Sequence, residues 1–272
     1  MSARSKRRPI ASGHAPQPPS RRAALRGALA GLGAMTLAGC DRLAQNEGFV
    51  DVLRSAETLS HGVHRAIAGR SAMAQEFGEA DIAAHFKSNG TLMPRDAEYQ
   101  ALLKSNFADY RLEVGGQVER PMSFGLADLR AMPARTQITR HDCVEGWSSI
   151  GKWKGVPLAH LLSLVRPTAQ ARYVMFRCAD SMDDPADGDS RYYESIDLDE
   201  AMHVQTLLAY DLNDRPLPVE NGAPLRARIE RQLGYKQPKY LHRIELVADY
   251  AKLAGGRGGY WEDQGYNWYG GI

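Results

Sequence analysis

The sequence contains little cysteine and lacks several well-known catalytic motifs. Only three of its 272 residues are cysteines, Cys40, Cys143 and Cys178, and no two of them form a CxxC pair. The lack of CxxC and HxxxH spacings counts against a closed zinc site, and the lack of CxxCH counts against an attached c-type haem. Neither a GxSxG motif nor a nucleotide-binding glycine loop occurs, which counts against α/β-hydrolases and nucleotide-binding folds.

The chain also lacks the basic surface that nucleic-acid binding requires. Its composition is 43% hydrophobic and 24% charged, which is ordinary for a globular protein with a sizeable core. Seven of the 34 basic residues lie within residues 1–40, which contain no acidic residue. The remaining chain has 27 basic and 32 acidic residues, so its body is mildly acidic and we expect no nucleic-acid partner.

The basic residues of the first forty positions belong to a predicted export signal. Arg21 and Arg22 form a twin-arginine pattern, and residues 28–39 are apolar but too few for the roughly 20 residues that span a membrane. The following Leu37–Cys40 segment resembles a lipobox, in which Cys40 is acylated, and Asp41 resembles a signal for retention at the inner membrane. We therefore predict a periplasmic protein with a lipid on Cys40; ordinary cleavage near Ala38 is the alternative.

The rest of the chain divides into a helical lead, residues 41–80, and a main domain, residues 81–272. Apolar residues between Phe49 and Ile67 recur at helical spacing, which predicts a helix over about 47–68. In the main domain, strands are predicted over 137–142, 173–178, 207–212, 225–229 and 240–247, and short helices over 125–131 and 157–165. Because strands and helices interleave without regular βαβ repeats, the pattern predicts an α+β fold.

Cys143 is the candidate catalytic residue. It ends a predicted strand and precedes a glycine-containing turn, in the stretch Arg140–Ser148 with the sequence RHDCVEGWS. Side chains at such a position are readily displayed to a ligand. By itself a lone cysteine is more often a small buried apolar residue, and in an oxidising compartment a Cys143–Cys178 disulfide is a second alternative.

Three ordered blocks resemble the sulfite oxidase superfamily of molybdopterin-dependent oxidoreductases, most closely its bacterial methionine-sulfoxide reductase branch. The blocks are FKSNG at 86–90, CVEGW at 143–147 followed by WKGVPL at 153–158, and NGAPLR at 221–226 followed by GYKQPKY at 234–240. The resemblance implies a molybdopterin-binding domain of mixed sheets with short helices. It also implies oxygen-atom transfer on a sulfur compound, with Cys143 as the protein ligand to molybdenum, whose soft character suits a thiolate.

The same resemblance implies the residues that hold the cofactor. They are Phe86, Asn89, Cys178, Asn221, Arg226, Gln237, Pro238 and Lys239. The planar guanidinium of Arg226 suits a phosphate. Cys178 stands where the bacterial reductases have a threonine, which puts its hydrogen bond in doubt. Glu145 is a candidate proton relay or orienting group, with a solvated or arginine-paired carboxylate as the alternative.

The resemblance further implies a separate electron partner, either a haem- or quinone-linked membrane protein or a cytochrome, and a monomeric enzyme. A cofactor of this kind is assembled in the cytosol, which agrees with export of an already folded protein. The arginine that would neutralise sulfite is absent after Gly146, which counts against sulfite as substrate, although a sulfite-type dehydrogenase is kept as a hypothesis. Two further hypotheses are a metal-free, lipid-anchored binding module and a thiol redox protein using Cys143 and Cys178.

Overall fold

A computed structural model of the chain describes residues 46–182 and 191–272. The predicted export signal and Cys40 lie outside the described residues. The chain forms two units, residues 1–55 and 56–272. The helix α2 (Glu47–Ala68) has the bounds that the apolar spacing predicts. Among the described helices, none is both long enough and apolar enough to cross a bilayer.

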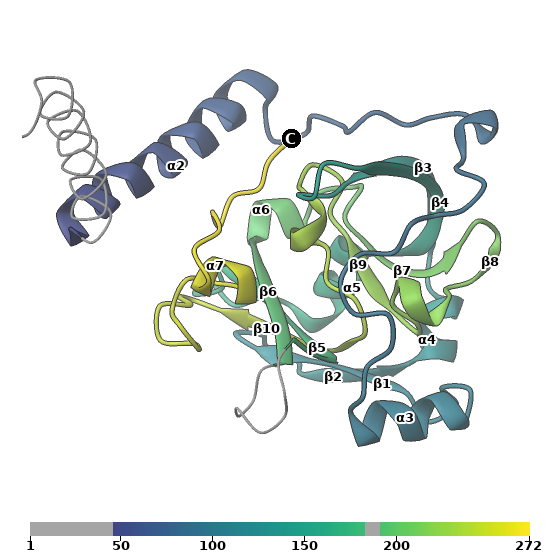
Figure 1. Cartoon of the computed structure of the whole chain (residues 1–272). Coiled ribbons are helices and arrows are strands. Elements are labelled where there is room, and N and C mark those ends of the chain that lie inside the picture. The colour runs from purple at the N-terminus through teal and green to yellow at the C-terminus, as the bar shows by residue number, and fades with distance from the viewer. Residues whose placement is uncertain (1–45, 183–190) are drawn as a thin grey trace, which may run out of the picture. The chain divides into compact units, whose positions relative to one another are not determined.

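The second unit is built on two five-stranded sheets, shown in Figure 1. The first sheet has the order β2-β1-β10-β5-β6, in which only the β1–β10 pair is parallel. Its strands are β1 (Arg111–Gly116), β2 (Met122–Gly125), β5 (Tyr173–Ser181), β6 (Arg191–Asp197) and β10 (Leu241–Val247). The second sheet is antiparallel, with the order β3-β4-β7-β8 and β9 paired to β7. Its strands are β3 (Arg135–Asp142), β4 (Ser148–Pro157), β7 (Leu207–Leu212), β8 (Arg215–Pro216) and β9 (Arg226–Arg228).

Short helices connect these strands. The α-helices are α3 (Ala97–Lys104), α4 (Leu126–Ala131), α5 (Leu158–Val165), α6 (Leu198–Ala201) and α7 (Tyr260–Asp263), and the 3₁₀ turns are η1 (Glu79–Asp81), η3 (Val219–Asn221) and η4 (Gly234–Lys236). Helix α5 begins directly after Pro157, as the sequence predicts, and its Leu158, Leu161, Leu162 and Val165 are fully buried. Mixed sheets with short helices confirm the predicted α+β fold.

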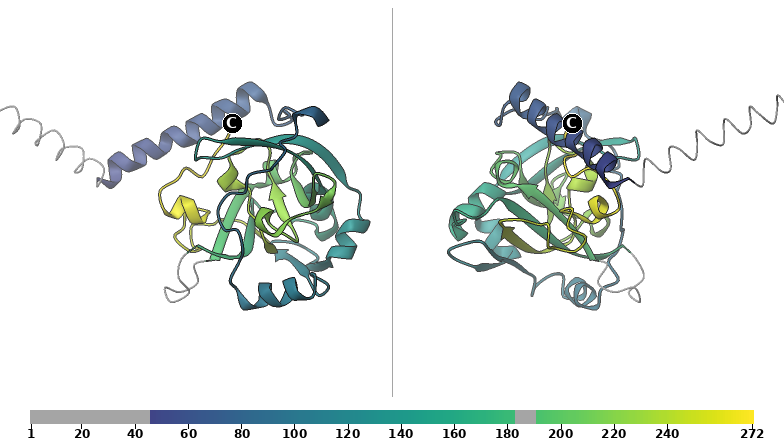
Figure 2. Two further views of the ribbon diagram at one scale, coloured as in Figure 1. Left: turned by 45° about the vertical axis from the view of Figure 1, so that its right-hand side comes forward. Right: turned by 90° about the vertical axis from the view of Figure 1, so that its left-hand side faces the viewer.

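The main core contains side chains from both sheets together with α5, and a smaller cluster gathers around Trp153. The predicted strands over 137–142, 173–178, 207–212, 225–229 and 240–247 are confirmed as β3, β5, β7, β9 and β10. Strands β3 and β4 form a hairpin in which Asp142 pairs with Ser148, and Figure 2 shows its long teal ribbons from two sides. The turn of this hairpin carries Cys143.

Candidate active site

The turn between β3 and β4 holds Cys143 in a defined position. The Cys143 backbone N–H donates to the Trp147 carbonyl at 2.9 Å, and the Gly146 N–H donates to the Cys143 carbonyl at 3.0 Å. Gly146 has φ +84°, a left-handed conformation that glycine adopts most easily. The Cys143 side chain is 8% exposed, and both Cys143 and Cys178 are free thiols, so the disulfide alternative is wrong.

Cys143 lines a cavity of about 160 Å³ to which several separate chain segments contribute. Residues 143–145 come from the hairpin turn, 89–91 from the segment before α3, and 237–239 from the segment before β10. The other contributions come from the neighbouring strands β5 and β6 and from the C-terminal tail, which provides Trp261 and Tyr266. The structure thus brings six predicted site residues to one cavity: Asn89, Cys143, Glu145, Gln237, Pro238 and Lys239.

Lys239 ties two of these segments together. Its buried ammonium donates to the carbonyls of Asn89 at 2.6 Å, Thr91 at 2.5 Å and Glu220 at 2.8 Å. Burial, with the nearby charge of Arg226, lowers the pKa of Lys239 to about 7. Asp180 also lines the cavity, and burial raises its pKa to about 6. The two pKa values shift in opposite directions for the same reason, because burial disfavours the charged form of each group.

Arg226 lies fully buried behind the cavity-lining segment 237–239. Its guanidinium donates to the Asn221 carbonyl at 3.0 Å and to the Gln237 carbonyl at 3.2 Å. Among the described residues no carboxylate forms an ion pair with it. Burial and the charge of Arg228 lower the pKa of Arg226 to about 9. A buried cation that has only carbonyl partners is suited to an anionic ligand.

His141 and Arg228 support the turn from behind, and the sequence did not single out Arg228. Arg228 donates to Nδ1 of His141 at 2.9 Å and pairs with Glu230 at 2.6 Å. Burial and the arginine charges lower the pKa of His141 well below its usual value, so its ring is neutral. Because Nδ1 accepts, the proton of the neutral ring lies on Nε2, and the histidine acts as a hydrogen-bonding support. The alternating Arg226-Ala227-Arg228 pattern could have predicted two arginines on one strand face.

Four predicted cofactor residues do not line this cavity: Phe86, Cys178, Asn221 and Arg226. Phe86 packs its ring edge-on against Trp153, with 4.9 Å between centroids, and lies 6.0 Å from the His141 ring. Cys178 is fully buried in the main core, and burial raises its pKa well above the usual value. Glu145 does line the cavity, but its carboxylate accepts from the indole N–H of Trp147 at 2.8 Å, a contact that the sequence did not predict.

Comparison with known proteins identifies the family. Residues 99–253 match the family described as "Oxidoreductase molybdopterin binding domain". A protein of Azospira oryzae named "Putative protein-methionine-sulfoxide reductase subunit YedZ1" is 37% identical over 253 residues, which cover 93% of this chain and 88% of that protein. The chain belongs to the molybdopterin-binding oxidoreductase family. The resemblance, the fold and the molybdopterin cofactor that the sequence predicts are thereby confirmed.

Other relatives match a shorter part of the chain. The catalytic subunit MsrP, a protein-methionine-sulfoxide reductase, is 39% identical over 147 residues in Xanthomonas axonopodis and 36% identical over 177 residues in Ralstonia nicotianae. These alignments cover 51% and 63% of this chain but only 45% and 53% of the two MsrP proteins. Among solved structures, the sulfane dehydrogenase SoxCD of Paracoccus pantotrophus matches with TM-score 0.47 and 23% identity, over 52% of this chain and 39% of that one.

The cavity of the molybdopterin-binding domain has features that fit its cofactor. Thirteen buried side-chain polar atoms of the described residues have no partner within the protein, and they include Asn89 Oδ1, His141 Nε2, Asn221 Nδ2, Arg226 Nε and Gln237 Oε1. Such atoms are uncommon because each costs about 1–3 kcal/mol when it is left unsatisfied. Four of them belong to residues that the family resemblance assigned to the pterin or its phosphate. A ligand that carries both an anionic group and N–H or O–H donors would satisfy this donor and acceptor set.

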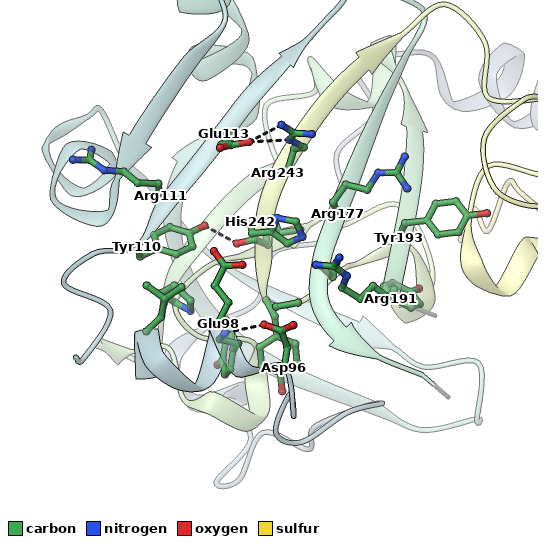
Figure 3. A pocket seen from close by; sticks show the side chains of 18 of the residues that line it. Asp96, Glu98, Tyr110, Arg111, Glu113, Arg177, Arg191, Tyr193, His242 and Arg243 are labelled. Atoms are coloured by element: carbon green, nitrogen blue, oxygen red, sulfur yellow. Dashed lines mark hydrogen bonds and ion pairs between the residues drawn. The ribbon is translucent and has the colours of Figure 1, made fainter. Parts of the chain in front are cut away.

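A second, larger cavity of the domain, about 820 Å³, lies over the exposed face of the first sheet (Figure 3). Its walls carry an alternating series of charges, in which Arg243 pairs with Glu113 at 2.7 Å and Arg177 pairs with Glu245 at 3.1 Å. Arg177 lines this second cavity and not the Cys143 cavity. The charges here largely compensate one another.

Proposed function

We propose that this protein is an exported molybdopterin-dependent reductase that converts a methionine sulfoxide, free or in a protein, to methionine. The observation that carries the proposal is the free thiol of Cys143 on a cavity shared with Asn89, Gln237 and Lys239. The names of the relatives favour this substrate and favour reduction over oxidation. The reaction consumes two electrons and two protons, and it releases the sulfoxide oxygen as water.

Each protein group has a role that its surroundings support. When bound, the molybdenum-pterin cofactor supplies oxygen-atom transfer coupled to a two-electron change. Cys143 would hold the metal through its sulfur, while Arg226 and Lys239 would hold the anionic part of the cofactor. Glu145 lies at the cavity rim, where it can orient or exchange a proton, and its bond to Trp147 keeps it there. The roles of Phe86 and Cys178 in binding stay predictions.

The electrons would come from a separate partner. The relatives in Xanthomonas and Ralstonia are named catalytic subunits, which implies that another subunit completes them. We propose a membrane-bound haem or quinol-linked protein, with the reductase itself a monomer on the periplasmic side. The twin-arginine pattern at Arg21 and Arg22 supports export, and the lipobox supports an acyl anchor on Cys40.

Replacing Cys143 and Cys178 one at a time tests the assignment of Cys143 as the metal ligand. We expect Cys143→Ser, made in cells with an intact cofactor pathway, to lose at least roughly a hundredfold in reduction of methionine sulfoxide by a reduced viologen dye. Its molybdenum signal should change or disappear. Cys178→Ser should keep most of this activity, because Cys178 lies in the core. Equal loss in both variants would instead indicate a dithiol redox protein.

Replacement of Arg226 tests how the cofactor is held. Arg226→Met removes a buried cation that has only carbonyl partners. Without cofactor this variant should be as stable as the wild type or more stable, because an uncompensated charge leaves the interior. It should nevertheless bind the cofactor roughly tenfold to a hundredfold more weakly, as expected for the loss of a charge-assisted hydrogen bond. Thermal unfolding and the molybdenum-to-protein ratio measure both effects, and an unchanged ratio would contradict the assignment.

A further inference from the structure

The part of helix α2 that belongs to the second unit, residues 56–68, carries an apolar stripe that faces away from that unit. From Ala56 onward the stripe consists of Ala56, Leu59, Val63 and Ile67, which follow one another at intervals of three or four residues and therefore share one helix face. The exposed fractions are 68% for Leu59, 43% for Val63 and 82% for Ile67. A helix on a soluble domain normally turns such a face inward.

The rotation of α2 about its axis is fixed by contacts on its other face. Glu57 accepts the backbone N–H of Tyr269 at 2.6 Å, and the His61 ring stacks on the Tyr269 ring with 4.2 Å between centroids. One turn later Arg65 pairs with Asp197 at 2.7 Å. Because Glu57, His61 and Arg65 lie at intervals of four residues, the polar face is the one held against the domain. The apolar stripe is consequently left exposed.

We propose that this stripe lies on the surface of a phospholipid bilayer, in the plane of the membrane. The inference rests on the proposed export and acylation of Cys40. Glu47 follows Cys40 by only seven positions, so an acyl anchor would keep the start of α2 within about 25 Å of the bilayer. An amphipathic helix that is too polar to span a membrane is the kind that binds at its interface.

A bilayer suits the stripe better than a protein partner does. Its side chains between residues 56 and 67 are all aliphatic and lie in one straight row along the helix. Protein interfaces usually depend on tryptophan, tyrosine or arginine anchors that enter a pocket, and the stripe contains none of these. Lipid binding needs only apolar side chains that can be buried among acyl chains. A helix held in this way would also fix which side of the domain faces the membrane.

Tryptophan placed on each face of α2 tests the proposal in the full, exported holoenzyme. Ile67→Trp adds the probe on the stripe, and the control Thr58→Trp adds it at an exposed position on another face. Both proteins are bound to vesicles of phosphatidylethanolamine and phosphatidylglycerol that contain brominated phosphatidylcholine, which quenches buried indole fluorescence. We expect loss of the added emission for Ile67→Trp and none for Thr58→Trp.

The remaining results overturn the proposal. These are quenching of neither probe, equal quenching of both, or failure of the protein to float with the vesicles. If neither probe is quenched but Leu59→Glu/Ile67→Glu slows turnover with quinol-containing membranes and not with dye, a protein partner covers the stripe instead. Mass spectrometry of Cys40 reports acylation, and the dye assay reports catalysis. A failure of the proposed function can therefore be distinguished from a failure of the stripe to bind the bilayer.

Discussion

At the scale of single residues, two arginines on one strand show how the same side chain takes different roles. Arg226 and Arg228 are both fully buried against the Trp153 ring, with their guanidinium carbons 5.1 and 4.4 Å from its centre. Arg228 has a carboxylate partner in Glu230, whereas Arg226 has only carbonyls. The charge of Arg228 is therefore compensated within the protein, and in the proposed function the charge of Arg226 is compensated by an anionic part of the cofactor.

Gly234 is a position where a single methyl group should disturb the site. A Cβ added there would lie 2.5 Å from Nε2 of His141, whose ring is buried and held by Arg228. We expect Gly234→Ala to destabilise the protein by about 1–3 kcal/mol through overpacking. Gly62→Ala on α2 is the control, because no atom lies within 4 Å of its added Cβ. Urea unfolding should show a lower free energy of unfolding only for Gly234→Ala. Equal stability of both variants would mean that the His141 ring moves aside at little energetic cost.

Asp180 should make the stability of the cofactor-free protein depend on pH. Burial raises its pKa from 3.8 to about 6, so its protonated form is favoured in the folded state. The resulting stabilisation is fully present below about pH 4 and is lost as the pH rises through 6. A shift of this size corresponds to about 3 kcal/mol. Relative to Asp180→Asn, the wild type should therefore become less stable between pH 4 and 7 in urea unfolding, and parallel curves would contradict the raised pKa.

At the scale of elements, a buried ion cluster attaches the C-terminal tail to the first sheet. Lys236 of η4 lies between Glu194 of β6 and Glu262 of α7, with 2.6 Å from its ammonium to Glu262. All three side chains are buried, and burial raises the pKa of Glu194 well above its usual value. Since Trp261 and Tyr266 of the same tail line the Cys143 cavity, this cluster also positions a cavity wall.

Lys236→Met should therefore release the tail. It leaves two buried carboxylates without their cation, which typically costs about 3–5 kcal/mol. We expect faster hydrogen exchange over residues 260–272 together with the loss of stability. Combining it with Glu194→Gln and Glu262→Gln removes the stranded charges and should restore much of the stability. A tail that stays protected in the single variant would show that its aromatic contacts suffice.

The elements with regular apolar spacing could be predicted from sequence, and those without it could not. Helix α2, strand β7 and helix α5 follow such spacing closely. Strand β4 was missed because Gly151 and Gly155 interrupt it, although the structure needs these glycines where Phe86 and the backbone of Leu208 approach closely. Strand β6 was missed because its polar Glu194 and Ser195 are buried by partners distant in sequence.

Residues of the site could be predicted only where they lie within a sequence motif of the family. Asn89, Cys143 and Lys239 were identified through family blocks, and the structure places them on one cavity. Asp180 was missed, although it lies two residues beyond Cys178 on the same face of β5. No local pattern distinguishes the two positions, although Cys178 lies in the main core and Asp180 lines the cavity.

At the scale of the whole molecule, the proposed export route should depend on both arginines of the signal. We expect Arg21→Lys/Arg22→Lys to lower the amount of periplasmic protein by roughly tenfold while cofactor-loaded precursor collects in the cytoplasm. Arg26→Lys is the control and should be exported normally. Immunoblots of cell fractions with molybdenum analysis measure both quantities. Undiminished export of the double variant would point to a different route.

The different burial of the thiols of Cys143 and Cys178 offers a way to measure which fraction of the protein molecules contains the cofactor. Cys143 is 8% exposed at its cavity, whereas Cys178 is fully buried in the main core, so we expect an alkylating reagent to reach only Cys143. In native protein, the reagent should modify Cys143 only in those copies where no metal holds its sulfur. The modified fraction at that peptide would then give the share of apoenzyme in any preparation, even in whole periplasm.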